Sequence, residues 1–295
     1  MIAIMKKRTK LPVALTIAGS DSGGGAGIQA DLKTFAALGV HGASAITCLT
    51  AQNPKRVLGV EPVSPKMLRQ QIEAVFEELP PAAVKTGMFF SAENVRIVAD
   101  FFKSNRRRDE FHESRSKKVM DSWNSSVRKL VLVVDPVMVS TSGAKLLEPE
   151  AVKILTEKLL PLAALVTPNL SEAEVLTGHK PVSVEEMREA ARQIHSRLGC
   201  AALVKGGHLR GVSEAVDIFF DGKTELLLSA PFVKGVRTHG TGCVYSAAIC
   251  AALALGHDLP DAVELGKKFV TAAIAGSYRV GHHFALGIYG SSRTL

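Results

Sequence analysis

Short apolar runs alternate with longer segments in which apolar residues recur every three or four positions, and this alternation continues along the chain. Runs of roughly four to eight apolar residues predict buried strands, and they are residues 11–18, 43–49, 83–87, 130–135, 164–167 and 201–205. Segments with helical spacing are residues 28–38, 65–79, 92–102 and 149–160, and those beginning at residues 171, 183 and 241. This alternation predicts an α/β fold in three layers, with helices on both faces of a largely parallel central sheet.

Local signals place several element ends. Ser64 and Pro65 form an N-cap and first-turn pair before a helix, and Gly39 follows another helix where left-handed backbone is common. Residues 56–63 indicate a small β excursion, and residues 215–229 indicate a hairpin. No internal repeat accompanies these elements.

The 295 residues are expected to form one domain, because α/β folds often reach this length without dividing. Two polar segments lack the periodic pattern: residues 1–10, a basic tail, and residues 103–129, a charged insertion that we expect to be poorly ordered. The tail carries a charge of +4 and the insertion +5, which leaves −1 for the remainder of a chain with net charge +8. The basicity therefore belongs to these two appendages, which argues against a nucleic-acid groove.

Composition supports a globular protein, with 46% hydrophobic and 22% charged residues. The longest apolar run, residues 243–255, is too short to span a bilayer, and residues 1–10 lack the apolar stretch that follows the basic cluster of a secretory signal. We therefore expect a cytoplasmic protein with no membrane partner. The four cysteines have no metal-binding spacing and are expected to be free thiols.

The hexapeptide Thr-His-Gly-Thr-Gly-Cys at residues 238–243 carries the most informative chemistry. It precedes an Ala-rich segment, so a helix is expected to begin there. The N–H groups of a helix N-terminus bind anions, and Gly240 and Gly242 would leave them unobstructed. Cys243 would lie in the first turn, where the same field lowers the pKa of a thiol and favours a thiolate. A plain glycine-rich loop with a structural cysteine is the alternative that the hexapeptide alone leaves open.

Two familiar nucleotide motifs fit incompletely. Residues 25–30 match the dinucleotide pattern G-x-G-x-x-A, but no acidic residue stands about 20 positions later, where that pattern needs one. Gly222-Lys-Thr resembles the end of a P-loop, but Asp217 occupies the position of its first glycine. These mismatches argue against a nicotinamide or flavin enzyme and against a Walker loop.

Several polar residues follow predicted strands and should meet at one edge of the sheet. Asp135 and Glu172 could hold Mg²⁺ through water, since this ion keeps much of its hydration shell. Lys205 could reach a transferring phosphoryl group and neutralise its charge. An ordinary strand-end aspartate is the alternative for Asp135, and a capping box of Ser171 and Glu174 is the alternative on the following helix.

These segments together resemble those of the ribokinase superfamily and, within it, the hydroxymethylpyrimidine/phosphomethylpyrimidine kinases of thiamine biosynthesis. The matching motifs occur in order along nearly the whole chain, and they are Thr-Ile-Ala-Gly-Ser-Asp-Ser-Gly-Gly-Gly-Ala-Gly-Ile-Gln-Ala-Asp-Leu-Lys (16–33), Leu-Thr-Ala-Gln-Asn (49–53), Lys-Thr-Gly-Met (85–88), Val-Asp-Pro-Val-Met (134–138), Thr-Pro-Asn-Leu-Ser-Glu-Ala (167–173), Val-Lys-Gly-Gly-His (204–208) and Thr-His-Gly-Thr-Gly-Cys (238–243). Each motif alone is weak, but together they are specific.

The resemblance implies a ribokinase-like α/β/α fold and ATP-dependent phosphorylation of 4-amino-5-hydroxymethyl-2-methylpyrimidine and then of its monophosphate. By the same resemblance, the pyrimidine pocket is lined by Gly19, Ala26, Asp31, Gln52, Met88 and Val137. The Mg²⁺ and ATP side would be formed by Asp135, Asn169, Glu172, Lys205 and Thr238, and the transferred phosphoryl group would be received by the N–H groups of Gly240, Thr241, Gly242 and Cys243. The Gln52 amide suits the edge of an aminopyrimidine. A homodimer is expected by the same analogy.

Cys243 stands where most ribokinase relatives have aspartate, as in the pyrimidine kinases and some pyridoxal kinases. The hydroxymethyl proton is weakly acidic, so a base would act late, and positioning and charge neutralisation would carry most of the catalysis. A cysteine-containing pyridoxal kinase is the alternative function, and a non-catalytic nucleotide-binding module is the alternative from another class. The insertion at residues 103–129 departs from the family pattern and is expected to be a surface loop.

Overall fold

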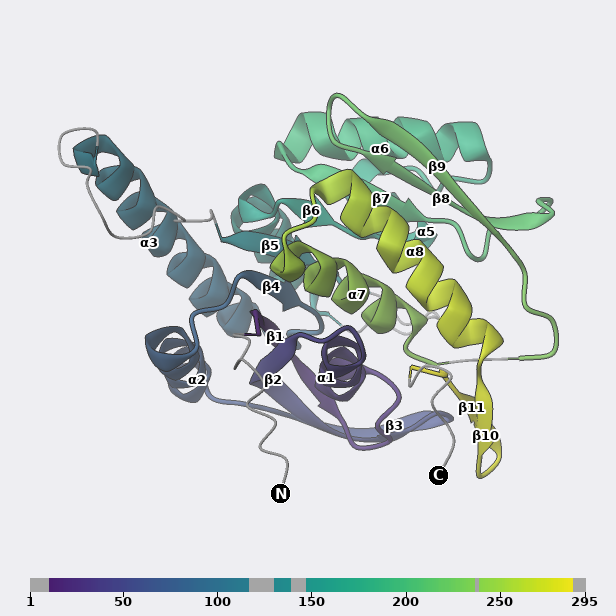
Figure 1. The fold of residues 1–295 in the computed structure, drawn as a ribbon, viewed down its shortest axis with the longest axis horizontal. Helices are drawn as coiled ribbons and strands as arrows, with labels where there is room; N and C mark the ends of the chain where they lie inside the picture. The colour runs from purple at the N-terminus through teal and green to yellow at the C-terminus, as the bar shows by residue number, and fades with distance from the viewer. Residues whose placement is uncertain (1–10, 117–129, 139–146, 237–238, 289–295) are drawn as a thin grey trace, which may run out of the picture.

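The computed structural model describes residues 11–116, 130–138, 147–236 and 239–288 (Figure 1). Its main sheet has nine strands in the order β3-β2-β1-β4-β5-β6-β7-β8-β9. Their bounds are β1 (Val13–Asp21), β2 (His41–Asn53), β3 (Arg56–Pro62), β4 (Ala83–Thr86), β5 (Val131–Val134), β6 (Leu165–Val166), β7 (Ala201–Lys205), β8 (Glu214–Phe220) and β9 (Glu225–Pro231). The six neighbouring strands β2, β1, β4, β5, β6 and β7 pair in parallel. At one edge of the sheet β3 pairs antiparallel with β2, and at the other edge β8 and β9 pair antiparallel.

Helices cover both faces of this sheet (Figure 1). One face packs against α1 (Gly27–Ala37), α7 (Thr241–Leu255) and α8 (Leu259–Ala275). The other packs against α2 (Pro65–Glu78), α3 (Ala92–Ser116), α4 (Pro149–Ile154), α5 (Leu170–Thr177) and α6 (Val184–Leu198). The predicted three-layer α/β/α architecture with a largely parallel central sheet is therefore confirmed.

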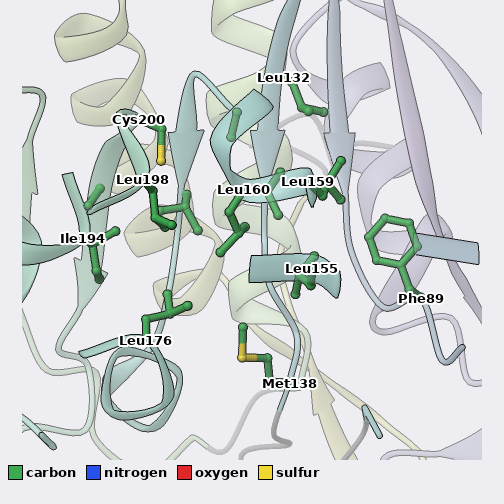
Figure 2. Close-up of a cluster of buried hydrophobic side chains, with 14 of the residues drawn as sticks. Phe89, Leu132, Met138, Leu155, Leu159, Leu160, Leu176, Ile194, Leu198 and Cys200 are labelled. Atoms are coloured by element: carbon green, nitrogen blue, oxygen red, sulfur yellow. The ribbon is translucent and has the colours of Figure 1, made fainter. Parts of the chain in front are cut away.

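The central strands are largely apolar because both of their faces are buried. In β5, Leu132 and Val134 belong to the core on the side of α3 to α6, and Val133 points into the core on the side of α7 and α8. Figure 2 shows part of the first core, where Leu132 lies near Leu159 and Leu160. A strand buried on one face only would have alternated with polar residues.

The predicted caps are confirmed. Ser64 is the N-cap of α2, and its hydroxyl accepts a hydrogen bond from the Met67 N–H at 3.3 Å, with Pro65 in the first turn. Gly39 follows the end of α1 with a φ of +75°, the left-handed conformation that favours glycine.

The charged insertion differs from the expectation in its first half. Helix α3 does not end near residue 102 but continues to Ser116, and Figure 1 shows its end extending away from the sheet. Lysine, arginine and glutamate are good helix formers, so a charged segment can continue a helix that a core anchors at its other end. The expected end of this helix near residue 102 is therefore wrong, whereas the expected poor order of the insertion stays a prediction. Residues 1–10 and 117–129 lie outside the described residues.

Two further elements depart from the sequence pattern. The helix predicted at residues 149–160 is α-helical only to Ile154 and continues as a π-helical turn, Leu155–Leu159, and a 3₁₀ turn, Leu160–Leu162. Pro161 explains why the helix ends here, because proline lacks the N–H that a longer helix needs.

A small hairpin of β10 (Tyr278–Val280) and β11 (His283–Ala285) was not predicted. Within the described ranges, no helix has the length and apolar character needed to cross a membrane.

Candidate active site

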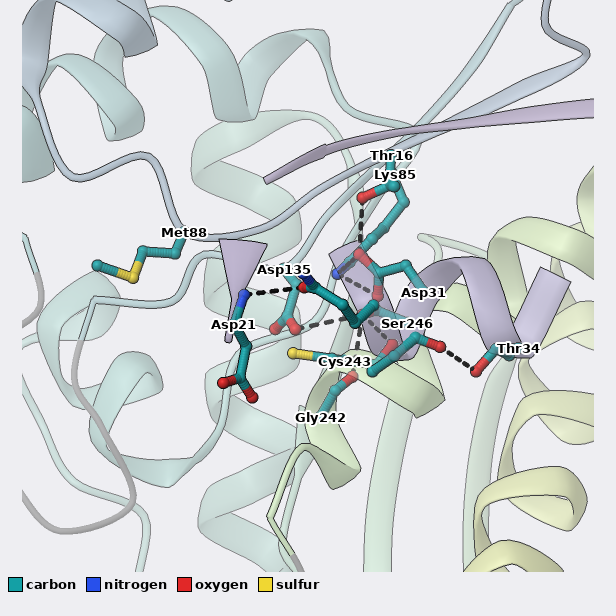
Figure 3. Close-up of polar contacts among 12 residues, drawn as sticks. Thr16, Asp21, Asp31, Thr34, Lys85, Met88, Asp135, Gly242, Cys243 and Ser246 are labelled. Atoms are coloured by element: carbon teal, nitrogen blue, oxygen red, sulfur yellow. Dashed lines mark hydrogen bonds and ion pairs between the residues drawn. The ribbon is translucent and has the colours of Figure 1, made fainter. Parts of the chain in front are cut away.

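A polar site lies at the carboxyl ends of the parallel strands, where the sequence predicted it. Asp135 follows β5, Lys205 ends β7, and the first turn of α7 lies beside both. A Cβ atom added to Gly242 would be 3.3 Å from Lys205 Nζ and 3.7 Å from Asp135 Oδ2. Figure 3 shows Gly242 and Cys243 beside Asp135. The structure thus brings together residues that are about 70 and 110 positions apart in the chain, as expected for a parallel sheet.

Asp135 joins three elements through its carboxylate. It accepts hydrogen bonds from Lys205 Nζ at 3.0 Å and from Thr167 Oγ1 at 3.2 Å, and Ser246 Oγ of α7 donates to its second oxygen at 3.2 Å. Burial raises the pKa of Asp135, but the nearby ammonium groups, Lys205 first, bring it below its ordinary value. Burial lowers the pKa of Lys205, but the nearby carboxylates, Asp135 first, bring it above its ordinary value. The pair is therefore ionised at neutral pH.

Asn169 and Glu172 form the capping box at the start of α5. The Asn169 side chain accepts a hydrogen bond from the Glu172 N–H at 3.0 Å, and Glu172 Oε2 accepts one from the Asn169 N–H at 2.8 Å. The alternative box of Ser171 and Glu174 is therefore wrong, because the N-cap is Asn169, two residues earlier, and asparagine is a strong N-cap. Burial raises the pKa of Glu172 to about 7, which the field of Lys205 only partly offsets.

The N-terminus of α7 has the geometry of an anion site. Gly240 is its N-cap with a φ of +83°, and a Cβ atom there would overlap the Gly25 carbonyl oxygen, so only glycine fits. The N–H groups of the first helical residues, Thr241 to Cys243, have no acceptor within the helix by geometry. They are therefore placed to receive an anion. Thr238 lies outside the described residues.

Cys243 lies in the first turn of α7, as predicted, and is half-buried, whereas the other three cysteines are buried. The predicted lowering of its pKa is wrong, because burial raises the pKa of the thiol to about 11. The positive charge of Lys85 and a hydrogen bond with the Gly27 backbone lower this pKa, but less than burial and the carboxylates of Asp31 and Asp135 raise it. In the free protein Cys243 is therefore a thiol at neutral pH.

A buried ion pair lies beside that thiol (Figure 3). Lys85 Nζ donates to both carboxylate oxygens of Asp31 at 2.8 Å, and Thr16 Oγ1 donates to Asp31 Oδ2 at 2.6 Å. Asp31 has no exposed surface. The structure thus buries this predicted pocket residue completely, and the side chains over it would have to move for a substrate to touch it.

The other predicted pocket residues lie near the ends of β1, β2, β4 and β5. Gly19 is tightly enclosed, since a Cβ atom there would be 2.8 Å from Cys48 Sγ. Val137 has a φ of +38°, an uncommon conformation for a β-branched residue.

The side chains of Gln52 and Met88 are half-buried. Figure 3 shows the Met88 side chain directed away from Asp31 and Cys243. Ala26 is the N-cap of α1, and its small side chain is buried.

Sequence reasoning did not assign a role to Lys85, Asp21 or His239. Lys85 could have been found, because a lysine inside an otherwise apolar central strand needs a buried partner. Asp21 ends β1 directly before the glycine-rich loop, and its carboxylate accepts hydrogen bonds from three N–H groups of that loop. His239 lies next to Gly240, and its Nε2 is 3.5 Å from Asp21 Oδ2.

The donor set suits a hydrated cation better than a directly bound one. Across the described part of the chain, no group of three or more His, Cys, Asp or Glu residues is arranged to hold a metal ion. Both oxygens of Glu172 accept backbone N–H groups, from Asn169 at 2.8 Å and Met138 at 3.3 Å, and Asp135 is bonded to Lys205. Asp135 Oδ1 accepts two hydrogen bonds, whereas Asp135 Oδ2 and both Glu172 oxygens accept one each and so keep a lone pair for a water molecule. A buried carboxyl with a raised pKa, such as Glu172, would also be stabilised as a carboxylate by a nearby cation.

Comparisons with known proteins agree with this geometry. A family model described as phosphomethylpyrimidine kinase matches residues 21–109 and 113–286. The chain is 47% identical over 281 residues to the hydroxymethylpyrimidine/phosphomethylpyrimidine kinase of Rhizobium meliloti (strain 1021), with 92% of this chain and 97% of that protein covered.

Two solved structures are similar over most of their length. The phosphomethylpyrimidine kinase of Clostridium difficile 630 is 43% identical with a TM-score of 0.73, covering 89% of this chain and 99% of that one. The pyridoxal kinase of Bacillus subtilis in complex with ADP is 34% identical with a TM-score of 0.79, covering 94% of this chain and 97% of that one. These neighbours confirm the ribokinase-like fold. The backbone does not separate the two substrate classes, whereas sequence identity favours the pyrimidine kinases.

Proposed function

Because the chain belongs to the phosphomethylpyrimidine kinase family, we propose that it transfers a phosphoryl group from ATP to 4-amino-5-hydroxymethyl-2-methylpyrimidine and then to the monophosphate so formed, for thiamine biosynthesis. The observation that carries this proposal is the arrangement of the α7 N-terminus beside the ionised pair of Lys205 and Asp135. An array of N–H groups and an ammonium group supports the negative charge of a phosphoryl group in transfer.

In this proposal the N–H groups of Gly240, Thr241, Gly242 and Cys243 hold the phosphoryl group in transit. Gly242 has no side chain to separate them from Lys205, whose ammonium group would be 3.3 Å from a Cβ atom there. Lys205 neutralises charge on the phosphoryl oxygens, and Asp135 keeps Lys205 protonated and directed. These groups are fixed before the substrate arrives, so little reorganisation is needed during the reaction.

Cys243 can act as a base only after it loses its own proton. With a pKa of about 11, the thiolate fraction in the free protein is on the order of 10⁻⁴ at pH 7. We propose that the reactive form is the small fraction of protein in which the Cys243 thiol has already released its proton to solvent, with Lys85 favouring that thiolate. The hydroxymethyl proton then moves to the Cys243 thiolate late, when the oxygen is already bonding to phosphorus. Most of the rate enhancement then comes from positioning and charge neutralisation.

We propose ATP as donor and Mg²⁺ as its counterion, held through water by Glu172 and Asp135. When bound, the ion neutralises charge on the ATP phosphates. Asn169 fixes the position of the Glu172 carboxylate through the capping box, and Thr238 completes this side of the site in the proposal. The pyrimidine is assigned to the pocket of Gly19, Ala26, Asp31, Gln52, Met88 and Val137.

Pyridoxal kinase activity is the second candidate, and the structural likeness to the Bacillus subtilis enzyme supports it. The test is side-by-side steady-state kinetics with ATP and either the aminopyrimidine or pyridoxal, followed by assay of a second transfer to the pyrimidine monophosphate. We expect kcat/KM to be higher for the pyrimidine and the diphosphate to form. A preference for pyridoxal would overturn the substrate assignment, and ATP binding without any product would favour a non-catalytic module.

Lys205→Met is the variant that connects this assay to the site. It should lower kcat by about 100-fold or more, because a charge contact in the transition state is lost. Lys268→Met is a matched control, since Lys268 pairs with Glu264 on the exposed surface of α8, and this variant should leave kcat unchanged.

The proposal also includes a homodimer and a cytoplasmic location. Light scattering of the purified protein tests the oligomeric state.

A further inference from the structure

Asp21 is a buried carboxylate to which the proposed phosphoryl transfer assigns no role. Its Oδ1 accepts a hydrogen bond from the Gly23 N–H at 2.7 Å, and its Oδ2 accepts from the N–H groups of Gly25 at 3.1 Å and Ala26 at 2.8 Å. The side chain is 4% exposed. One carboxylate therefore organises the whole glycine-rich loop between β1 and α1.

The same carboxylate also faces the loop that precedes α7. His239 Nε2 lies 3.5 Å from Asp21 Oδ2, which is longer than a typical hydrogen bond. This nitrogen is buried and has no hydrogen-bond partner within the described residues. His239 directly precedes Gly240, the N-cap of α7. Asp21 thus contacts both sides of the site.

The two loops also touch through their backbones. A Cβ atom on Gly240 would overlap the Gly25 carbonyl oxygen and would be 3.2 Å from Ala26 Cα, and a Cβ atom on Gly25 would be 3.3 Å from the His239 ring. Such close packing means that a shift of one loop is transmitted to the other. The N-caps of α1 and α7, Ala26 and Gly240, therefore pack directly against each other.

We propose that Asp21 is a positioning residue that, through His239, couples the β1–α1 loop to the N-terminus of α7. This inference rests on the proposed kinase activity. The β1–α1 loop carries Ala26, which is assigned to the pyrimidine pocket, and the α7 N-terminus carries the N–H groups assigned to the phosphoryl group. Asp21 aligns the accepting hydroxyl with these N–H groups without touching either substrate, and a misalignment of about 1 Å can cost on the order of 100-fold in rate.

A purely local role for Asp21, as the cap of its own loop, makes a different prediction. A local cap would act independently of His239 and mainly on the affinity for the pyrimidine, so the effects of changing Asp21 and His239 would multiply. The coupling proposed here affects kcat more than KM, and it makes Asp21 and His239 act as one unit.

The kinetic test is a double-mutant cycle with Asp21→Asn, His239→Gln and the double variant. We expect each single variant to lower kcat by about tenfold, with the KM for the pyrimidine and for ATP changed by less than about threefold. The double variant should fall no more than about twofold below Asp21→Asn. Effects that multiply in the double variant would overturn the coupling. His179→Gln, which breaks an exposed His–Glu contact of 3.1 Å far along the chain from both loops, is the control and should leave kcat unchanged.

A second measurement needs no substrate. The Val244 N–H donates to the Gly240 carbonyl at 3.0 Å and reports on the first turn of α7. In Asp21→Asn and in His239→Gln, hydrogen exchange of this amide should be at least about tenfold faster than in the unmodified protein. Unchanged exchange at Val244 would overturn the coupling, even if the kinase assay succeeds. If exchange changes as expected but the pyrimidine is not phosphorylated, the coupling stands and the proposed function fails.

Discussion

Lys85 Nζ lies 2.8 Å from both carboxylate oxygens of Asp31, and neither side chain has any exposed surface. The pair connects β4 to α1 and contributes opposing charges to the surroundings of Cys243. A buried ion pair is weak evidence for stability in itself, but the loss of one partner leaves an uncompensated charge in the core. The pair is therefore expected to be intolerant of single substitutions.

Lys85→Met should lower the free energy of unfolding by about 3–5 kcal/mol, because Asp31 would remain buried without its counterion. The double variant Lys85→Met/Asp31→Leu should recover most of that loss. Urea denaturation followed by circular dichroism measures both effects. Lys268→Met, at an exposed pair on α8, is the matched control and should cost less than about 1 kcal/mol. If Lys85→Met and Lys268→Met lowered the free energy of unfolding equally, burial of the Lys85–Asp31 pair would not make it more sensitive to substitution than an exposed pair.

Alkylation of Cys243 by iodoacetamide in the free protein should be slow at pH 7 and should rise about tenfold per pH unit up to pH 10. The reason is that burial raises the pKa of this thiol to about 11, so the thiolate becomes abundant only at high pH. Mass spectrometry of the modified peptide measures the rate. A rate that levels off near pH 7 to 8 would show that the field of the helix N-terminus exceeds the effect of burial.

Much of the site followed from the sequence because parallel strands bring their carboxyl ends together. Asp135 and Lys205 were predicted to meet, since each follows an apolar run, and they lie 3.0 Å apart. The pKa of Cys243 could not be predicted, because it depends on the depth of burial and on carboxylates from distant parts of the chain. The part of α3 beyond residue 102 was not predicted for another reason. A helix that extends away from the core needs no apolar stripe, so its sequence lacks the pattern on which the prediction relied.

Cys243→Ala should lower kcat for the aminopyrimidine by about 100-fold or more, while the Kd of the pyrimidine changes by less than about threefold. A base that acts only in the transition state contributes to kcat and not to binding. Steady-state kinetics and calorimetric titration measure the two quantities. Cys200→Ala, at a buried cysteine in the core on the side of α6, is the control and should retain kcat. Near-normal turnover by Cys243→Ala would show that Cys243 is not the base.

Gly240→Ala should lower kcat by about 100-fold, because its φ of +83° and the nearby Gly25 carbonyl oxygen leave no room for a side chain. The α7 N-terminus would have to move away from the β1–α1 loop. Gly59→Ala is a matched control in β3, since a Cβ atom there meets no atom within 4 Å, and it should retain kcat. A fully active Gly240→Ala variant would show that the position of this N-cap does not matter for transfer.

The stability of the protein should depend on the ionisation of Asp21 at acid pH. Burial raises the pKa of Asp21, but the contact with His239 and the N–H groups of Gly23 and Ala26 lower it more, to about 2, from an ordinary value of 3.8. A carboxyl with a lowered folded-state pKa contributes stability above its unfolded pKa and loses it as the pH falls through the folded pKa. The contribution is about 2 kcal/mol at neutral pH and disappears between roughly pH 4 and pH 2. Urea denaturation from pH 6 to pH 2 should therefore show the difference between the unmodified protein and Asp21→Asn shrinking by about that amount, and a difference that stays constant over this range would contradict the assigned ionisation.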